Sequence, residues 1–234
     1  MLASMEKHPA SRDAFTAGSL QIAPILVGVI PFGLIAGIAA VDAGLGSFQA
    51  YALSPLMFAG AAQLAMVDLI GHDAAPVVIV ATALVINTRF AMYSAALAPV
   101  FLDLGPIRKA YGSYLITDQS FAVSVLRFNR IDEPLTLRFA YFLGASISLW
   151  GTWQVTSILG VAIGARVPEA WALDFAIPLV FIALLFPSIK DGGGAVAAIT
   201  AATAAVAFAS LPLNLGLLVA AAAGLIAGTI WGRR

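Results

Sequence analysis

Long apolar runs occupy most of this chain and follow one another with only short polar segments between them. A helix needs about 20 mostly apolar residues to cross the hydrocarbon core of a bilayer. The sequence therefore predicts an all-α fold, a polytopic transmembrane bundle of about seven or eight helices. Seven candidate spans have the required length and composition: Gly18–Ala40, Gln49–Ile70, Pro76–Phe101, Phe139–Gly164, Trp171–Ile189, Gly193–Ser210 and Pro212–Trp231.

Charged residues are too few for a water-facing surface. They make up 10% of the 234 residues, and hydrophobic residues make up 61%, whereas soluble domains carry roughly 25% charged residues. We therefore expect most of the surface to face lipid. The expected organisation is a short cytoplasmic N-terminal segment, residues 1–17, followed by a single transmembrane domain, residues 18–234.

Composition also argues against several classes of function. The formal net charge is zero, which gives no reason to expect a nucleic-acid partner. There is no cysteine and there are only two histidines, so we expect no metal site and no cofactor. The chain also lacks a Gly-rich phosphate loop and the common hydrolase motifs. We therefore do not expect an enzyme, and active transport would have to draw on an ion gradient or another subunit.

An eighth candidate span, Ala110–Phe128, is weaker because four polar residues interrupt it. It either crosses the membrane against the bundle interior or enters and leaves on the same side. The four residues are Thr117, Asp118, Gln119 and Ser120.

The placement of basic residues bears on this choice, because cytoplasmic loops collect lysine and arginine. If Ala110–Phe128 spans, four basic groups share the side of the N-terminus, while Arg108, Lys109 and Arg166 are exceptions. We therefore expect eight spans with both termini cytoplasmic; a re-entrant segment remains the alternative. The four groups are Lys7 with Arg12; Arg127, Arg130 and Arg138; Lys190; and Arg233 with Arg234.

Prolines and glycines fall inside several candidate spans. Proline removes a backbone donor and clashes with the preceding turn. Pro24 and Pro31 flank Gly28 in the first run, and Pro55 lies in the second. We predict that the first helix is bent or interrupted at Pro24, Gly28 and Pro31; simple kinks that aid packing are the alternative.

Two further patterns concern the packing of the helices. Pairs of glycines four residues apart permit close helix approach; they are Gly33 and Gly37, Gly160 and Gly164, and Gly224 and Gly228. An offset of 123 residues also matches the segment from Pro55 with that from Pro178, and Gly37 with Gly160. This suggests an internal repeat, whose halves would be parallel if all eight segments span and inverted if the eighth candidate is re-entrant.

Polar residues inside the apolar runs are the best candidates for a functional site, because each costs free energy unless it faces protein or water. Arg89 lies near the middle of its run, too deep to reach the interface, and Asp118 lies inside Ala110–Phe128. We predict that the two share one polar site in the bundle interior. Tyr93, four residues after Arg89, shares its helix face, whereas Asn87 points nearly the opposite way.

Each of these residues also has a purely structural interpretation. Arg89 and Asp118 would then be an ion pair that holds two helices together. Gln63 and Asn87 would be interhelical hydrogen-bonding groups.

Three segments resemble the AzlC-type branched-chain amino acid permeases, the large subunits of a bacterial two-component transporter. They are Phe58-Ala59-Gly60-Ala61-Ala62-Gln63, Asn87-Thr88-Arg89-Phe90-Ala91-Met92-Tyr93-Ser94 and Thr117-Asp118-Gln119-Ser120-Phe121-Ala122. The chain departs from the family pattern at Ala62, Leu64 and Gln119, where serine, an aromatic residue and glutamate are common. The last departure leaves Asp118 as the only acid of its motif.

The resemblance implies proton-driven export of leucine, isoleucine, valine or close analogues, and a small hydrophobic AzlD-type partner with about four helices. The implied substrate-binding or coupling residues are Gln63, Asn87, Arg89, Tyr93, Asp118 and Gln119, with apolar walls from Phe58, Phe90, Met92 and Phe121. Two other functions stay open. One is a membrane-embedded enzyme that acts on lipid through Asp68, Asp118 or His72, and the other is a structural subunit without its own pathway.

Overall fold

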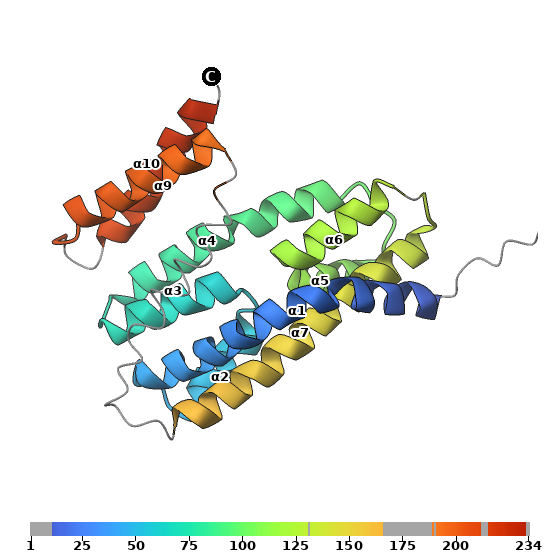
Figure 1. The fold of residues 1–234 in the computed structure, drawn as a ribbon, viewed down its shortest axis with the longest axis horizontal. Coiled ribbons are helices and arrows are strands. Elements are labelled where there is room, and N and C mark those ends of the chain that lie inside the picture. Colours follow the sequence, from blue (N-terminus) through green and yellow to red (C-terminus); the bar gives the residue numbers. More distant parts are fainter. Residues whose placement is uncertain (1–10, 131, 166–188, 190, 212–214, 233–234) are drawn as a thin grey trace, which may run out of the picture.

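The computed structural model describes residues 11–130, 132–165, 189, 191–211 and 215–232 (Figure 1). Every regular element within these residues is an α-helix, which confirms the all-α prediction. The candidate span Trp171–Ile189 falls almost wholly outside the described residues. The helices are α1 (Ser11–Asp42), α2 (Ser47–Leu56), α3 (Gly60–Gly71), α4 (Pro76–Leu97), α5 (Pro106–Leu115), α6 (Asp118–Phe128), α7 (Leu135–Gly164), α9 (Gly192–Ala207) and α10 (Leu215–Gly232).

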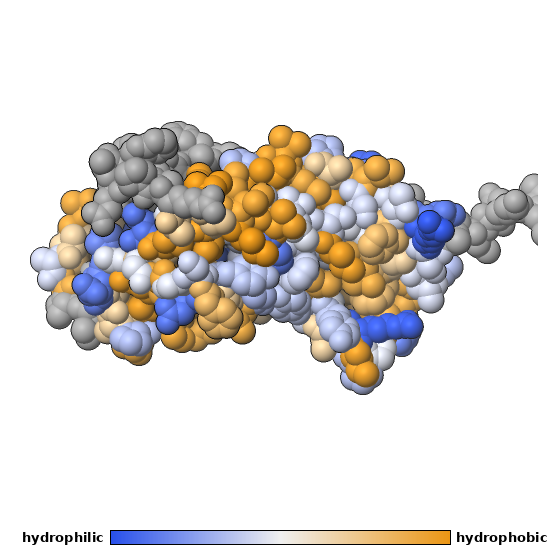
Figure 2. All heavy atoms as spheres, turned by 90° about the horizontal axis from the view of Figure 1, so that it is seen from below, coloured by the Kyte–Doolittle hydropathy of each residue, from blue (hydrophilic) through white to orange (hydrophobic). Residues whose placement is uncertain are grey.

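Four of these helices, α1, α4, α7 and α10, are long and apolar enough to cross a membrane. Their outer faces carry exposed aliphatic residues such as Leu20, Val27 and Leu84. In Figure 2 hydrophobic residues cover much of the length of the molecule, and strongly hydrophilic residues gather toward its two ends. This distribution matches a body whose middle lies in hydrocarbon.

Helices α1 and α7 form the central pair of the bundle. They pack along most of their length and run in the same direction, with Phe15 against Gly144 near one end and Ile38 against Gly164 near the other. At Gly160 an added Cβ would overlap the backbone of α1 around Leu34, so this crossing requires glycine. The predicted close approach through paired glycines is therefore present.

The same pair bears on the proposed repeat. Gly37 and Gly160, matched by the 123-residue offset, lie against each other in the contact between α1 and α7. Because these two helices are parallel, the elements that the offset matches here are parallel, not inverted. The second partner segment of the repeat, from Pro178, lies outside the described residues.

Helix α1 continues unbroken through both of its prolines, so of the two predicted possibilities, a bend or an interruption, the interruption is wrong. Pro24, Gly28 and Pro31 all lie on the exposed face, and a Cβ added at Gly28 would meet nothing within 4 Å. The opposite face is buried against the rest of the bundle. The proline rings therefore project away from the packing.

The second candidate span, Gln49–Ile70, is not one helix but a re-entrant hairpin of two short ones. Helix α2 ends at Leu56, directly after Pro55, and α3 begins at Gly60. Gly71 at the end of α3 lies close to Ala43, just before α2, so both ends of the hairpin are at the same end of the bundle. Its tip reaches mid-depth, where Ala59 and Ala62 pack with Ala83 of α4.

The segment Ala110–Phe128 forms a second hairpin, which enters from the other end. Helix α5 ends at Leu115, and α6 begins at Asp118. Both outer ends of this hairpin lie close to the start of α7, because Arg108 of α5 lines one cavity with Phe139 and Arg127 of α6 lies over the Tyr141 ring. The prediction of eight spans is therefore wrong for both segments, and the re-entrant alternative holds for the second.

Two re-entrant hairpins leave the basic residues at one end of the bundle. Each hairpin returns the chain to the side that it came from, so the starts of α1, α5 and α7 and the end of α6 lie together (Figure 1). Arg108 and Lys109, exceptions under eight spans, then join the others. Among the described residues every lysine and arginine except Arg89 lies at this end: Arg12, Arg108, Lys109, Arg127, Arg130 and Arg138.

Helices α9 and α10 form a separate antiparallel pair. Gly224 and Gly228 of α10 lie against Ala201 and Ala197 of α9, the close approach predicted from the spacing of these glycines. Figure 1 shows the pair beside α4, with the C-terminus at its outer end.

Candidate functional site

The tips of the two hairpins meet near the middle of the bundle. The Tyr114 hydroxyl, at the end of α5, donates a hydrogen bond to the Pro55 carbonyl oxygen in α2 at 2.7 Å. It also accepts one from the Trp150 indole of α7 at 3.0 Å. The Phe58 ring lies 6.3 Å from that of Tyr114. Hydrogen bonds thus join the tips of two hairpins that enter the bundle from opposite ends.

An ion pair lies beside this junction. Arg89 Nη1 of α4 is 2.8 Å from Asp118 Oδ2 of α6. The Tyr93 hydroxyl donates a hydrogen bond to the other carboxylate oxygen, Asp118 Oδ1, at 2.6 Å. Both oxygens of Asp118 are therefore engaged by α4, and the predicted proximity of Arg89 and Asp118 is present.

The local sequence explains why these three side chains converge. Arg89 and Tyr93 are one helical turn apart on α4 and so share a face. The Tyr93 ring stacks on Phe121 of α6, with centroids 4.5 Å apart, which aligns the two helices. Asp118 is the first residue of α6, where the helix dipole favours negative charge.

The turn before α6 is fixed by its own hydrogen bonds. Thr117 caps the helix by accepting a bond from the backbone N–H of Ser120, and Ser120 Oγ accepts one from the N–H of Thr117. This reciprocal cap defines where α6 starts. It therefore also fixes the position of Asp118 relative to α4.

The ion pair is half-buried, not sealed in the interior as predicted. The Arg89 and Asp118 side chains are 27% and 36% exposed. Arg89 Nε is nevertheless buried and has no hydrogen-bond partner among the described residues. The guanidinium thus keeps an unused donor, and its plane lies near the Phe90 ring, with Cζ 5.2 Å from the centroid. Because the Arg89 side chain is partly exposed, its guanidinium can bind a carboxylate that approaches from outside the protein.

Other predicted site residues do not join the pair. Gln63 is fully buried and faces Ser54 across the first hairpin at 3.4 Å. Asn87 lies on the unbroken helix α4, which keeps it on a different face from Arg89, and its Oδ1 is buried without a partner. Gln119 follows Asp118 but has no polar contact with Arg89 or Tyr93 among the described residues.

The predicted apolar walls are present only in part. Phe90 and Phe121 flank Tyr93, with ring centroids 6.3 and 4.5 Å away. Phe58 packs at the hairpin junction. Met92 is 65% exposed and does not line the site.

Ser54 and Tyr114 were not predicted as site residues. Tyr114 and Pro55 are 59 residues apart, and no spacing rule links them. Ser54 had a weak signal, since it is a polar residue directly before a proline in an apolar run.

The acids named for an enzymatic alternative are far apart. Asp68 and His72 lie together at the outer end of α3, 3.8 Å apart and largely exposed, whereas Asp118 is at mid-depth. Within the described part of the chain, no three His, Cys, Asp or Glu residues converge.

These features define a polytopic α-helical membrane protein in which two re-entrant hairpins meet beside a half-buried ion pair. The family model described as AzlC protein matches residues 24–167, more than half of the chain. The chain belongs to the AzlC protein family, and this membership makes it a transporter-type membrane protein. The matched region contains both hairpins, Arg89 and Asp118.

Two relatives support this assignment. An uncharacterized membrane protein of Archaeoglobus fulgidus is 30% identical over 223 residues, 93% of this chain and 95% of the relative. An uncharacterized membrane protein of Helicobacter pylori is 26% identical over 184 residues, 77% of this chain and 76% of the relative. No solved structure matches.

Proposed function

We propose that this protein is a subunit of a secondary transporter that exports branched-chain or other hydrophobic amino acids in exchange for protons. One observation carries the proposal: the half-buried Arg89–Asp118 pair lies beside the point where the tips of the two re-entrant hairpins meet. Discontinuous helices at mid-membrane commonly form substrate and ion sites in secondary transporters. Backbone outside a regular helix is tolerated at that depth only where protein or a water-filled cavity surrounds it.

The pair has the right chemistry for an amino acid zwitterion. The substrate carboxylate would bind the partly exposed Arg89 guanidinium in place of Asp118. The substrate ammonium would bind Asp118, whose two oxygens already accept bonds from α4. Phe90 and Phe121 border the site and would contact a hydrophobic side chain.

Proton coupling follows from the same competition. In the absence of substrate, the Asp118 carboxylate pairs with Arg89 at 2.8 Å. The substrate ammonium and a proton would both neutralise this one carboxylate, so only one of them can occupy it at a time, as exchange requires. Binding of substrate and binding of a proton are thereby linked at one acid.

We further propose a small AzlD-type partner with about four helices, and a location in the cytoplasmic membrane with both termini cytoplasmic. The clustering of basic residues at the end where α1 begins supports this orientation. The described part of the chain has four spanning helices, few for a complete pathway. A partner would supply further walls.

The test is leucine, isoleucine and valine efflux from proteoliposomes that contain this chain with and without its partner. An imposed proton gradient should accelerate efflux from vesicles that contain both proteins. Asp118→Asn should abolish the acceleration, and Arg130→Gln, an exposed basic residue away from the pair, should leave it intact. The proposal is wrong if well-folded protein moves none of the three amino acids in either form.

A further inference from the structure

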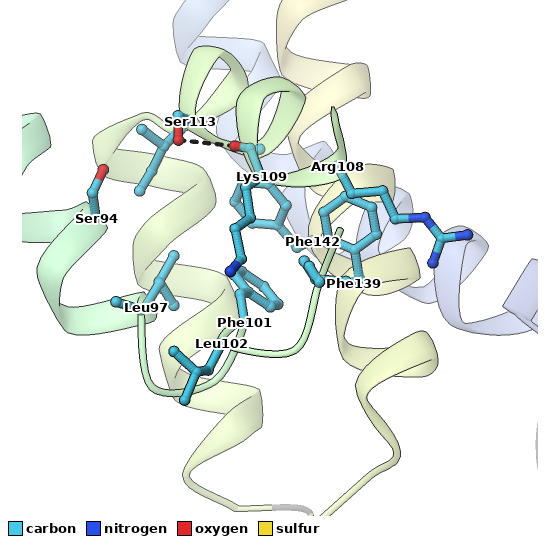
Figure 3. A pocket seen from close by; sticks show the side chains of 13 residues that line it. Ser94, Leu97, Phe101, Leu102, Arg108, Lys109, Ser113, Phe139 and Phe142 are labelled. Carbon is cyan, nitrogen blue, oxygen red and sulfur yellow. Dashed lines mark hydrogen bonds between the residues drawn. The ribbon is translucent and has the colours of Figure 1, made fainter. Parts of the chain in front are cut away.

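A cavity of about 210 Å³ lies between the end of α4, helix α5 and the start of α7 (Figure 3). Its lining is mainly apolar and includes Leu97, Phe101, Ile116, Phe139 and Phe142. Leu97, Ile116, Phe139 and Phe142 belong to a buried hydrophobic cluster of their own, separate from the core around α1 and α7. The cavity is thus an apolar recess at the edge of the bundle.

Two basic residues that are consecutive in the sequence line this recess. Arg108 and Lys109, in the first turn of α5, complete its lining, and both are exposed. Figure 3 shows the Lys109 side chain crossing the cavity beside Phe101 and Leu102, while the Arg108 guanidinium extends outward past Phe139. Neither cation forms an ion pair within the described part of the chain.

The start of α5 adds to the positive character of the recess. Helix α5 begins at Pro106 and has no side-chain cap at its N-terminus. The free amides and the helix dipole at such a terminus favour an anion. Asp103, in the preceding loop, is exposed and pairs with neither cation.

The recess opens onto a surface suited to lipid. Leu102, Ile107 and Tyr111 next to it are 68%, 70% and 63% exposed. Only Leu115 of α5 is buried, so the protein itself covers little of this helix. The start of α5 lies at the end of the bundle that holds the other basic residues, where a membrane–water interface would fall (Figure 1).

We propose that this recess binds an anionic phospholipid. The phosphate would lie between Arg108, Lys109 and the uncapped start of α5, and one acyl chain would follow the aromatic floor toward Ile116. Basic pockets between membrane helices recognise anionic headgroups in this way. An inorganic anion would gain nothing from the apolar lining, whereas an acyl chain fills it.

A bound lipid would also support the second hairpin. Ile116 lies at the inner end of the recess and directly precedes Thr117, the cap of α6. The lipid would therefore fill the space behind the segment that positions Asp118. This binding is independent of what the protein transports.

The full chain, purified in mild detergent, should be titrated with phosphatidylglycerol and with phosphatidylcholine, and lipid adducts should be counted by native mass spectrometry. We expect phosphatidylglycerol to bind and phosphatidylcholine to bind much more weakly. The double variant R108Q/K109Q should lower phosphatidylglycerol affinity by about 30-fold, since each basic residue near a membrane surface contributes about fivefold. Arg130→Gln, at the same end but outside the recess, should have no comparable effect.

A second variant tests the apolar part of the recess. Gly112 lies in the lining, and an added Cβ would sit 3.7 Å from Phe139 and 3.8 Å from Phe142, so a larger side chain extends into the empty space. Gly112→Leu should weaken lipid binding while both cations remain, and the melting temperature should show that the variant is folded.

Several outcomes would overturn the proposal. One is equal binding of phosphatidylglycerol by the wild type and a folded R108Q/K109Q variant. Another is an equal loss in Arg130→Gln, which would mean general attraction to the basic end. Stabilisation by inorganic phosphate equal to that by phosphatidylglycerol would show an anion site without an acyl chain. Loss of the lipid when a partner subunit binds would show that this face is a protein interface.

Discussion

The Tyr114 hydroxyl donates a hydrogen bond to the Pro55 carbonyl oxygen at 2.7 Å and thereby joins the tips of two hairpins that enter the bundle from opposite ends. Trp150 of α7 donates to the same hydroxyl, so a spanning helix is tied to the junction as well. A carbonyl at a helix break in hydrocarbon needs a donor from the protein. Tyr114 supplies that donor, and the junction lies beside the ion pair of Arg89 and Asp118.

Tyr114→Phe should destabilise the protein and slow transport. The variant keeps the ring that contacts Phe58 but leaves the Pro55 carbonyl and the Trp150 indole without their partner. The cost should be about 0.5–1.5 kcal/mol, the net contribution of an ordinary hydrogen bond, because Tyr114 is 41% exposed. The melting temperature in detergent and the efflux rate in proteoliposomes are the measurements. Tyr111→Phe on the same helix is the matched control, because Tyr111 is 63% exposed and an unchanged melting temperature is expected there.

Labelling from the two sides of the membrane should distinguish the re-entrant topology from eight spans. The chain has no cysteine, so single cysteines can be introduced without background. His72 and Asp103 would switch sides between the two topologies. With two hairpins, His72→Cys should react from outside the cell and Asp103→Cys only from the cytoplasm. Labelling of His72→Cys only from the cytoplasm and of Asp103→Cys from outside would support the topology with eight spans.

Much of the helical architecture was predictable because unpaired backbone N–H and C=O groups are costly in hydrocarbon. A helix pairs these groups within one segment. The division of Gln49–Ile70 and Ala110–Phe128 was harder to predict. Two half-helices contain as many apolar residues as one span, so hydropathy is nearly the same for both. Proline was also ambiguous, since α1 passes through Pro24 and Pro31 while α2 ends just after Pro55.

The ion pair and Tyr93 beside it were predictable, whereas the junction of the two hairpins was not. Arg89 and Asp118 stood out because each is too costly to leave in lipid, and that cost requires a partner whatever the fold. Gln63 and Asn87 carry no such requirement, because a neutral amide can be satisfied by one nearby hydroxyl. Gln63 is paired in this way with Ser54.

Gly160→Ala should destabilise the contact between α1 and α7. The new Cβ would overlap the Leu34 backbone, which can move only by displacing the helix. Overpacking of this kind costs typically about 1–3 kcal/mol. Gly151→Ala on the same helix should be neutral or slightly stabilising, because nothing lies within 4 Å of its added Cβ. Melting temperatures of the two variants in one detergent would test the contrast, and equal losses would argue against the parallel α1–α7 packing.

Arg89→Lys should weaken substrate binding more than it weakens folding. Lysine keeps the positive charge that Asp118 requires, but it loses the planar fork that engages a carboxylate with two parallel bonds. Hydrogen bonds to charged groups contribute roughly 1.5–3 kcal/mol, so the apparent affinity should fall by about tenfold or more. Efflux measured over a range of internal leucine concentrations would show a raised half-saturation value. An unchanged value would mean that Arg89 serves only the ion pair.

Asp118→Asn should abolish the pH dependence of transport while leaving the site assembled. Asparagine keeps an oxygen that can accept the Tyr93 hydrogen bond, and it retains the shape that Thr117 and Ser120 position at the start of α6. It cannot bind a proton, so substrate and proton binding would no longer be linked. Efflux down a leucine gradient should persist at a similar rate from pH 6 to pH 8, whereas the wild type should respond to pH and to an imposed proton gradient. Asp132→Asn is the matched control, because this exposed acid pairs with Arg138 at the basic end, away from Arg89, and its loss should leave the pH response intact. A normal pH response in Asp118→Asn would assign coupling to another acid. Asp68, which lies at the outer end of α3, would then be the next to test.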